Sequence, residues 1–233
     1  MDYLKYKHYS FDLWRTLIKS HPRFKKERAK YLYENYNFAN KSLIEFEKTI
    51  RQVDLMCNAI NEKNGGNIDA EEMYYFILCQ VNETPDVVKS IDMQQLYTDV
   101  EQLIERYTPI IYDENTISTL AKIKTFPDVT LNILSNTGFI KGKTLRKVLH
   151  KIGLTEYFDF QLYSDELNVS KPSKHFFNEM LHQVEVIRKD KLPKAQIVHI
   201  GDNYFADIEG AIAFGINACH INTNDKTIKT LLI

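Results

Sequence analysis

The spacing of apolar residues changes character near residue 110. Before that point, apolar residues recur every three or four positions over residues 31–60, 70–81 and 87–107. This spacing builds an apolar stripe along a helix. Asp69 with Glu72 three residues later also matches a capping box, which marks a helix start. We find no convincing strand between residues 18 and 110, so we predict an all-helical insert there.

From residue 111 onwards, short apolar runs alternate with helical segments. Helices predicted at residues 115–124, 143–152, 174–186 and from about Phe205 lead to the runs VTLNILSN, FDFQLYS, QIVHIGD and INACHI. Strands joined through helices predict an α/β fold with a doubly wound parallel sheet. Residues 6–13 form one more predicted strand. This strand joins the sheet only if residues 18–110 leave the sheet and return, so we expect a core of residues 1–17 and 111–233.

Charge and composition exclude several classes of partner. The chain has 30 Lys plus Arg against 31 Asp plus Glu, a formal charge of −1, which gives no reason to expect nucleic acid or an anionic membrane. No apolar run approaches the roughly 20 residues that span a bilayer. The N-terminal ten residues lack an apolar signal core, and the three cysteines are scattered. We expect a cytoplasmic monomer or homodimer that binds a small molecule.

Polar residues gather where the predicted strands end. Because ligands of open parallel sheets bind outside the carboxyl ends of the strands, we expect these residues to share one edge. In chain order they are Asp12, Thr16, Ser135, Asn136, Lys171, Asp202 and Asp207.

This set of residues suits phosphoryl transfer. Clustered carboxylates repel one another unless a cation lies among them, and oxygen ligands favour Mg²⁺. Ser135 and nearby backbone N–H groups can donate to phosphoryl oxygens, and Lys171 can neutralise negative charge. Asp12 can then attack phosphorus and form an aspartyl-phosphate that water hydrolyses.

Four short motifs resemble those of the haloacid dehalogenase-like (HAD) hydrolases. They are FDLWRTL, ILSNT, SKP and GDNYFAD, in this order along the chain. The resemblance covers residues 8–17 and about 111–222. It implies a Rossmann-like hydrolase core, and residues 18–110 match the place where many members insert a helical cap that closes over the substrate.

The resemblance also implies a role for each matching residue. Asp12 would be the nucleophile and a Mg²⁺ ligand, together with the backbone carbonyl of Trp14 and with Asp202. Asp207 would support the metal through water or Lys171. The phosphoryl group would be held by Ser135, Asn136, Lys171 and Thr16.

Trp14 departs from the family pattern. Most family phosphatases carry Asp at this place, where it protonates the leaving oxygen and then activates water, and such help is worth roughly 10²–10⁴ in rate. Arg15 also replaces a common Gly, from which we infer that no positive φ is required there. Trp14 either packs against the cap or contacts substrate.

Three functions remain compatible with Trp14. The first is a Mg²⁺-dependent phosphatase that manages without this acid, acting on a small phosphorylated metabolite. The second is a weak or inactive phosphate-binding protein, and the third is a 2-haloacid dehalogenase, because those enzymes carry Tyr here and release halide without protonation. The metal-free dehalogenases lack a pair like Asp202 and Asp207, so we favour the phosphatase.

Other charged residues have simpler interpretations. We expect His199, inside an apolar strand, to be a core histidine with its hydrogen bonds satisfied, not a ligand. Lys25, Lys26 and Arg28 read as a solvated helix face. One helical face also carries four polar residues that could point at the substrate: Arg51, Asp54, Asn58 and Asn61.

Overall fold

The computed structural model describes residues 5–83 and 85–232 of the chain. Its centre is a five-stranded sheet with the order β5-β4-β1-β6-β7, in which every neighbouring pair is parallel. The strands are β1 (His8–Phe11), β4 (Thr130–Ser135), β5 (Phe160–Tyr163), β6 (Ile197–Gly201) and β7 (Asn217–His220). The predicted α/β fold with a parallel sheet is confirmed.

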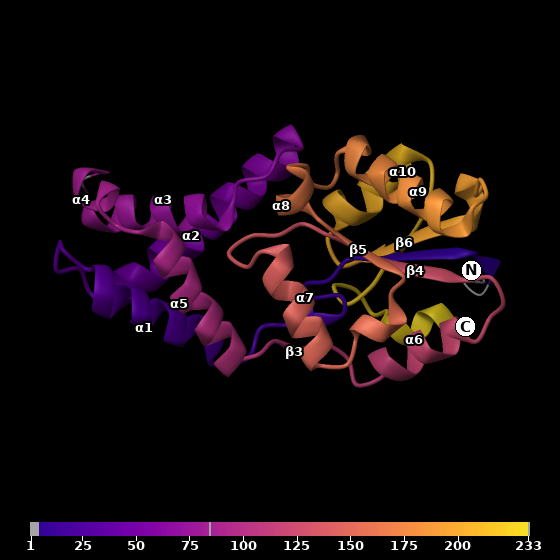
Figure 1. The fold of residues 1–233 in the computed structure, drawn as a ribbon, viewed down its shortest axis with the longest axis horizontal. Coiled ribbons are helices and arrows are strands. Elements are labelled where there is room, and N and C mark those ends of the chain that lie inside the picture. Colours follow the sequence, from indigo (N-terminus) through magenta and orange to yellow (C-terminus); the bar gives the residue numbers. More distant parts are fainter. Residues whose placement is uncertain (1–4, 84, 233) are drawn as a thin grey trace.

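Helices cover both faces of this sheet (Figure 1). They are α6 (Thr116–Lys124), α7 (Gly142–Lys151), α9 (Lys174–Arg188) and α10 (Gly210–Phe214), while the single turn α8 (Ser164–Leu167) directly follows β5. The helix that we predicted to start near Phe205 begins with a π-helical turn, Tyr204–Glu209, before α10. All four residues of β1 are buried because the strand is central and covered on both sides.

The described residues of the insert form five helices, which lie beyond one end of the sheet (Figure 1). They are α1 (Phe24–Tyr36), α2 (Leu43–Asn64), α3 (Ala70–Asn82), α4 (Pro85–Lys89) and α5 (Met93–Arg106). Capping boxes begin two of them: Ser42 with Glu45 at α2, and the predicted Asp69 with Glu72 at α3. Helix α2 ends at Gly65, whose φ of 74° is left-handed and suits glycine.

A short antiparallel ribbon marks the two crossings between the sheet and the insert. Strand β2 (Ile18–Lys19) pairs with β3 (Ile110–Ile111), and the N–H of Tyr112 donates to the carbonyl of Leu17 at 2.9 Å. We predicted no strand here, because two residues are too few to show alternation. Neither strand belongs to the main sheet. The division into a core and a cap (18–110) stays our prediction, and the ribbon lies at its proposed boundaries.

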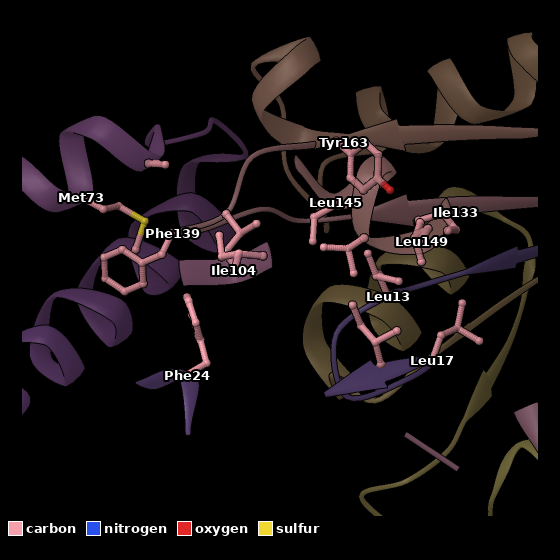
Figure 2. Packing of buried hydrophobic residues seen from close by; sticks show 14 of the residues in the cluster. Leu13, Leu17, Phe24, Met73, Ile104, Ile133, Phe139, Leu145, Leu149 and Tyr163 are labelled. Carbon is pink, nitrogen blue, oxygen red and sulfur yellow. The ribbon is translucent and has the colours of Figure 1, made fainter. Parts of the chain in front are cut away.

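The insert and the sheet share buried side chains. Phe139, from the loop after β4, lies between Phe24 of α1 and Met73 of α3 (Figure 2). Its ring also packs against Tyr74, with centroids 5.2 Å apart. The backbone approaches closely as well, since the N–H of Ser170 donates to the carbonyl of Gly65 at 2.9 Å. The loop after β4 therefore anchors the insert above the edge of the sheet.

Candidate active site

Asp12 occupies the centre of the edge where the strands end. It follows β1, and its N–H donates to the carbonyl of Ile200 on β6 at 2.8 Å. Each carboxylate oxygen accepts one hydrogen bond: Oδ1 from Lys171 Nζ at 2.8 Å and Oδ2 from the Thr16 hydroxyl at 3.1 Å. These contacts fix the orientation of the proposed nucleophile, which is 7% exposed and lines the cleft above the sheet.

Lys171 joins Asp12 to Asp207 through a buried network. Its Nζ also donates to Asp207 Oδ1 at 2.7 Å, and His199 Nε2 donates to the same oxygen at 3.1 Å. Because a carboxylate only accepts, this contact places the His199 proton on Nε2, and Nδ1 accepts from the hydroxyl of Ser10 at 2.9 Å. His199 is thus the satisfied core histidine that we predicted, and it also orients Asp207.

Asp207 depends on a glycine beneath it. A Cβ atom at Gly201 would lie 2.2 Å from Asp207 Oδ2, so only glycine leaves room for the carboxylate. Oδ2 also accepts from the N–H of Asn203 at 3.0 Å. With both oxygens engaged and 1% exposure, Asp207 is suited to holding Lys171 in place.

The three carboxylates form a site that fits a divalent cation. One oxygen from each of Asp12, Asp202 and Asp207 lies within 4.8 Å of the others, and all three residues are buried. Among the residues described, Lys171 is the one buried lysine, and Arg15, which is largely exposed, contacts Asp202 Oδ2 at 3.3 Å. The donor set is all oxygen, which matches the preference of Mg²⁺.

The pKa values reflect this crowding. Burial raises the pKa of Asp12 to about 7; Lys171 opposes the shift, while Asp207 and Asp202 add to it. Burial likewise raises the pKa of Asp202 to about 6. For Asp207, burial acts in the same direction, but Lys171 and His199 outweigh it and hold the pKa below its usual range. Two of the three carboxylates therefore ionise with difficulty unless a cation joins them.

The proposed phosphate-binding residues divide into two groups. Asn136 and Lys171 line the cleft and are tied together, because the Asn136 side chain donates to the Lys171 carbonyl at 2.9 Å and accepts from its N–H at 2.7 Å. Ser135 and Thr16 are fully buried and do not line the cleft. Ser135 Oγ donates to the Asn136 carbonyl at 3.2 Å, so both hydroxyls contact neighbouring protein groups.

The turn after Asp12 differs from expectation at Arg15. Its φ is 59°, so our inference that no positive φ is required there was wrong. The tight turn is closed by the N–H of Arg15 donating to the carbonyl of Ile18 at 2.7 Å. A non-glycine residue in this region carries strain. Beside it, Trp14 is half-buried, packs against the hydrophobic core and lines the cleft.

The cleft has a volume of about 1240 Å³ and is walled by both the sheet edge and the insert. The four predicted polar residues of α2 all line it, although several are already engaged. Arg51 pairs with Asp54 at 2.8 Å, and Asn58 donates to Asp54 at 3.2 Å. Asn61 is buried and accepts from the N–H of Ile68. Their contact with substrate stays a prediction.

Arg28 contradicts the solvated face that we predicted on α1. Lys25 and Lys26 are exposed as expected, but Arg28 is only 6% exposed. Its guanidinium lies over the ring of Phe139 at 4.3 Å from the centroid, and over that of Phe24 at 5.4 Å. Phe24, four residues earlier on the same helix, was the one sequence signal for this burial.

The buried carboxylates therefore form a cluster that could hold a metal ion at the edge of an α/β sheet, and comparison with known proteins gives the family. Residues 10–221 match the family model described as haloacid dehalogenase-like hydrolase, so the chain belongs to this family. None of the helices in residues 5–83 and 85–232 is long and apolar enough to cross a bilayer.

Individual relatives are more distant. The uncharacterised protein YMR130W of Saccharomyces cerevisiae is 32% identical over 62% of this chain and 47% of its own length. The pyrimidine 5′-nucleotidase YjjG of Escherichia coli is 30% identical over 41% of this chain and 39% of its own. The chain thus covers less than half of these curated relatives. YfnB from Bacillus subtilis, solved bound to magnesium, shares the fold at a TM-score of 0.70 and 17% identity, covering 95% of this chain and 91% of YfnB.

Proposed function

We propose that this protein is a Mg²⁺-dependent phosphatase that acts on a small phosphorylated metabolite through an aspartyl-phosphate on Asp12. The observation that carries the proposal is the cluster of three buried carboxylates around a single buried lysine. Such a cluster is stable in its ionised form only with an added cation. The names of two relatives, a 5′-nucleotidase and a magnesium-bound protein, point in the same direction.

The residues present fit Mg²⁺. Asp12, Asp202 and the backbone carbonyl of Trp14 would hold it, and Asp207 would support it through water or through Lys171. When bound, the ion would neutralise negative charge on the phosphoryl group and on the carboxylates.

The chain's own groups then account for the first chemical step. Lys171 and Thr16 hold the Asp12 carboxylate so that one oxygen can form a bond to phosphorus. The bond from phosphorus to the leaving oxygen breaks, and that oxygen departs with the electron pair. Lys171 and Asn136 stabilise charge on the phosphoryl oxygens from the walls of the cleft.

The second step returns the enzyme to its starting state. A water oxygen attacks phosphorus, the bond to Asp12 breaks, and inorganic phosphate and the Asp12 carboxylate result. The water must lose a proton in this step, and the indole of Trp14 accepts none. We therefore expect hydrolysis of the aspartyl-phosphate to limit turnover.

Trp14 also predicts the order of substrates. The first step lacks a proton donor at position 14, so leaving groups that depart as stable anions should react fastest. Aryl and acyl phosphates should be preferred over alkyl phosphates. A rapid burst of released phenol, equal to the amount of enzyme, should precede a slower steady phase. Asp12→Asn should abolish both phases.

One panel of assays separates the three candidate functions. The purified protein is mixed with aryl, acyl and alkyl phosphates and with 2-haloacids, each with and without Mg²⁺. Mg²⁺-dependent release of aryl alcohol supports the phosphatase. Halide release without Mg²⁺ would instead assign a dehalogenase. Binding of phosphate esters without release of any product would assign a binding protein. Alkyl phosphates hydrolysed as fast as aryl phosphates, with no burst, would refute the role given to Trp14.

A further inference from the structure

A second cation, Arg28, lies in the wall of the cleft away from the carboxylate cluster. Arg28 belongs to α1 and lines the cleft, and only 6% of its surface is exposed. Its Nε atom has no hydrogen-bond partner in the described part of the chain. A guanidinium stays charged at physiological pH, and a buried charge without a counter-ion costs free energy. A ligand can supply the missing counter-ion.

The neighbours of Arg28 are aromatic and neutral. Phe139 and Phe24 present their rings to the guanidinium, and the hydroxyl of Tyr74 lies beside it and donates to the Phe139 carbonyl at 3.4 Å. No carboxylate of residues 5–83 and 85–232 lies within ion-pair distance. The Tyr74 hydroxyl shares a side-chain hydrogen bond with Arg28, but it is neutral and supplies no counter-charge. The remaining N–H groups of the guanidinium suit two-pronged binding to an oxyanion.

Three other cations that line the cleft already have carboxylate partners, unlike Arg28. Arg15 pairs with Asp202, Arg51 pairs with Asp54, and Lys171 is shared by Asp12 and Asp207. Lys25, one turn before Arg28, also lines the cleft and has no ion pair within the residues described. Positive charge without a partner therefore collects on this part of the α1 wall.

The distance from this wall to the reacting groups suits one small molecule. Residues 136–140 form one strip of the cleft, which begins at the proposed phosphate ligand Asn136 and includes the Phe139 ring beneath Arg28. Three residues of chain span at most about 11 Å between Cα atoms. A ligand of metabolite size can bridge the two ends.

We propose that Arg28 binds a second oxyanion of the substrate, a carboxylate or a second phosphate, in addition to the phosphoryl group that reacts at Asp12. The proposal rests on the proposed phosphatase function and narrows its substrate class to dianionic or bifunctional small molecules. Arg28 is in this sense a specificity-determining residue, and it does not touch the reacting atoms.

Matched aryl phosphates test this assignment. Phenyl phosphate, 3-carbamoylphenyl phosphate and 3-carboxyphenyl phosphate present no group, a neutral amide and a carboxylate of the same shape, and 1,3-phenylene bisphosphate presents a second phosphate. The parent should favour the carboxylate or the bisphosphate over the amide at least about tenfold in kcat/KM, since charge-assisted hydrogen bonds are involved. The preferred ester then shows whether Arg28 binds a carboxylate or a second phosphate.

Variants of α1 provide the controls. Arg28→Met should remove the preference while changing kcat/KM for phenyl phosphate by no more than about twofold. Arg28→Lys keeps the positive charge but loses the paired N–H donors of the guanidinium, so it should retain part of the preference. It also replaces Arg28→Met as the test variant if that protein does not fold. Lys26→Met, an exposed cation of the same helix that does not line the cleft, should leave the preference intact.

Two results would overturn the proposal. One is a parent enzyme that treats the amide and both anions alike. The other is an equal loss for all four esters in Arg28→Met and Arg28→Lys, which would indicate a structural role. Binding of the same esters to Asp12→Asn, with and without Arg28→Met, separates this proposal from the proposed function. Arg28-dependent binding, together with no turnover of any ester by the parent, would keep the anion site and reject the phosphatase.

Discussion

The central strand β1 carries a buried titratable group near each end, and the two ends treat it differently. His8, at the amino end, bonds to neutral partners: Thr130 Oγ1 at 2.8 Å and Asn132 Oδ1 at 2.9 Å. Asp12, just past the carboxyl end, lies among two further carboxylates and one lysine. Burial penalises the charged form at both ends. At the amino end, His8 is neutral and its hydrogen bonds are satisfied. At the carboxyl end, three carboxylates share one buried lysine, so negative charge remains that a bound cation can neutralise.

Of the substitutions considered, removal of Lys171 should have the largest effect on stability and on turnover. Lys171→Met leaves Asp12 and Asp207 buried without their shared cation, so we expect roughly 3–5 kcal/mol lower free energy of unfolding in the absence of Mg²⁺ and no measurable turnover. Urea unfolding and the aryl phosphate assay measure the two effects.

The control for Lys171 is a second ion pair. Lys124 contacts Asp159 at 2.8 Å, but both side chains are more than a quarter exposed. Lys124→Met should cost no more than about 1 kcal/mol. Equal losses for the two lysine variants would show that the carboxyl end of the sheet holds no special charge network.

The buried His8 at the amino end of β1 predicts that the stability of the fold depends on pH. Burial lowers the pKa of His8 to about 4, whereas the unfolded value is about 6.5. Between these values the unfolded chain binds the extra proton, so stability is present above pH 6.5 and is lost as the pH falls towards 4. The loss should be about 3 kcal/mol.

The neutral variant His8→Gln isolates this term. Carboxylates also titrate in acid, but they do so in both proteins, so the difference in unfolding free energy between parent and variant cancels them. That difference should shrink by about 3 kcal/mol from pH 7 to pH 4. A constant difference across this range would mean that His8 is not held neutral by the fold.

A smaller effect on stability is expected at Gly201. In Gly201→Ala the new Cβ would lie 2.2 Å from Asp207 Oδ2, so Asp207 must move. We expect the free energy of unfolding to fall by roughly 1–3 kcal/mol. Turnover should fall at least tenfold, because Asp207 positions Lys171. Gly153→Ala is the matched control: its φ of +73° also disfavours alanine, but nothing lies within 4 Å of the new Cβ. If Gly153→Ala lowered turnover as much, displacement of Asp207 could not be the cause.

The same contrast explains how much the sequence could reveal. Asp12, Asn136, Lys171, Asp202 and Asp207 follow strand ends, and parallel strands bring their ends to one edge whatever the details. Their convergence was therefore predictable from chain order. The family motifs added their proposed roles, and the helical periodicity predicted the insert.

Features that depend on distances between distant segments could not be read in this way. Arg28 appears in the sequence beside two exposed lysines, and its closer ring contact, with Phe139, comes from the distant loop after β4. Nor does the spacing show that Ser135 and Thr16 face neighbouring protein groups or that Arg15 takes a positive φ. These depend on tight turns and side-chain packing.

Titration of the metal-free protein with Mg²⁺ by calorimetry tests the central claim most directly. The parent should bind one ion, and Asp202→Asn should weaken binding at least tenfold, because the variant loses a charged oxygen ligand. Asp54→Asn, which alters a carboxylate of the same cleft that pairs with Arg51, should leave the affinity unchanged. Unchanged Mg²⁺ affinity in Asp202→Asn, or no binding by the parent, would contradict the assignment of a metal site to the carboxyl end of the sheet.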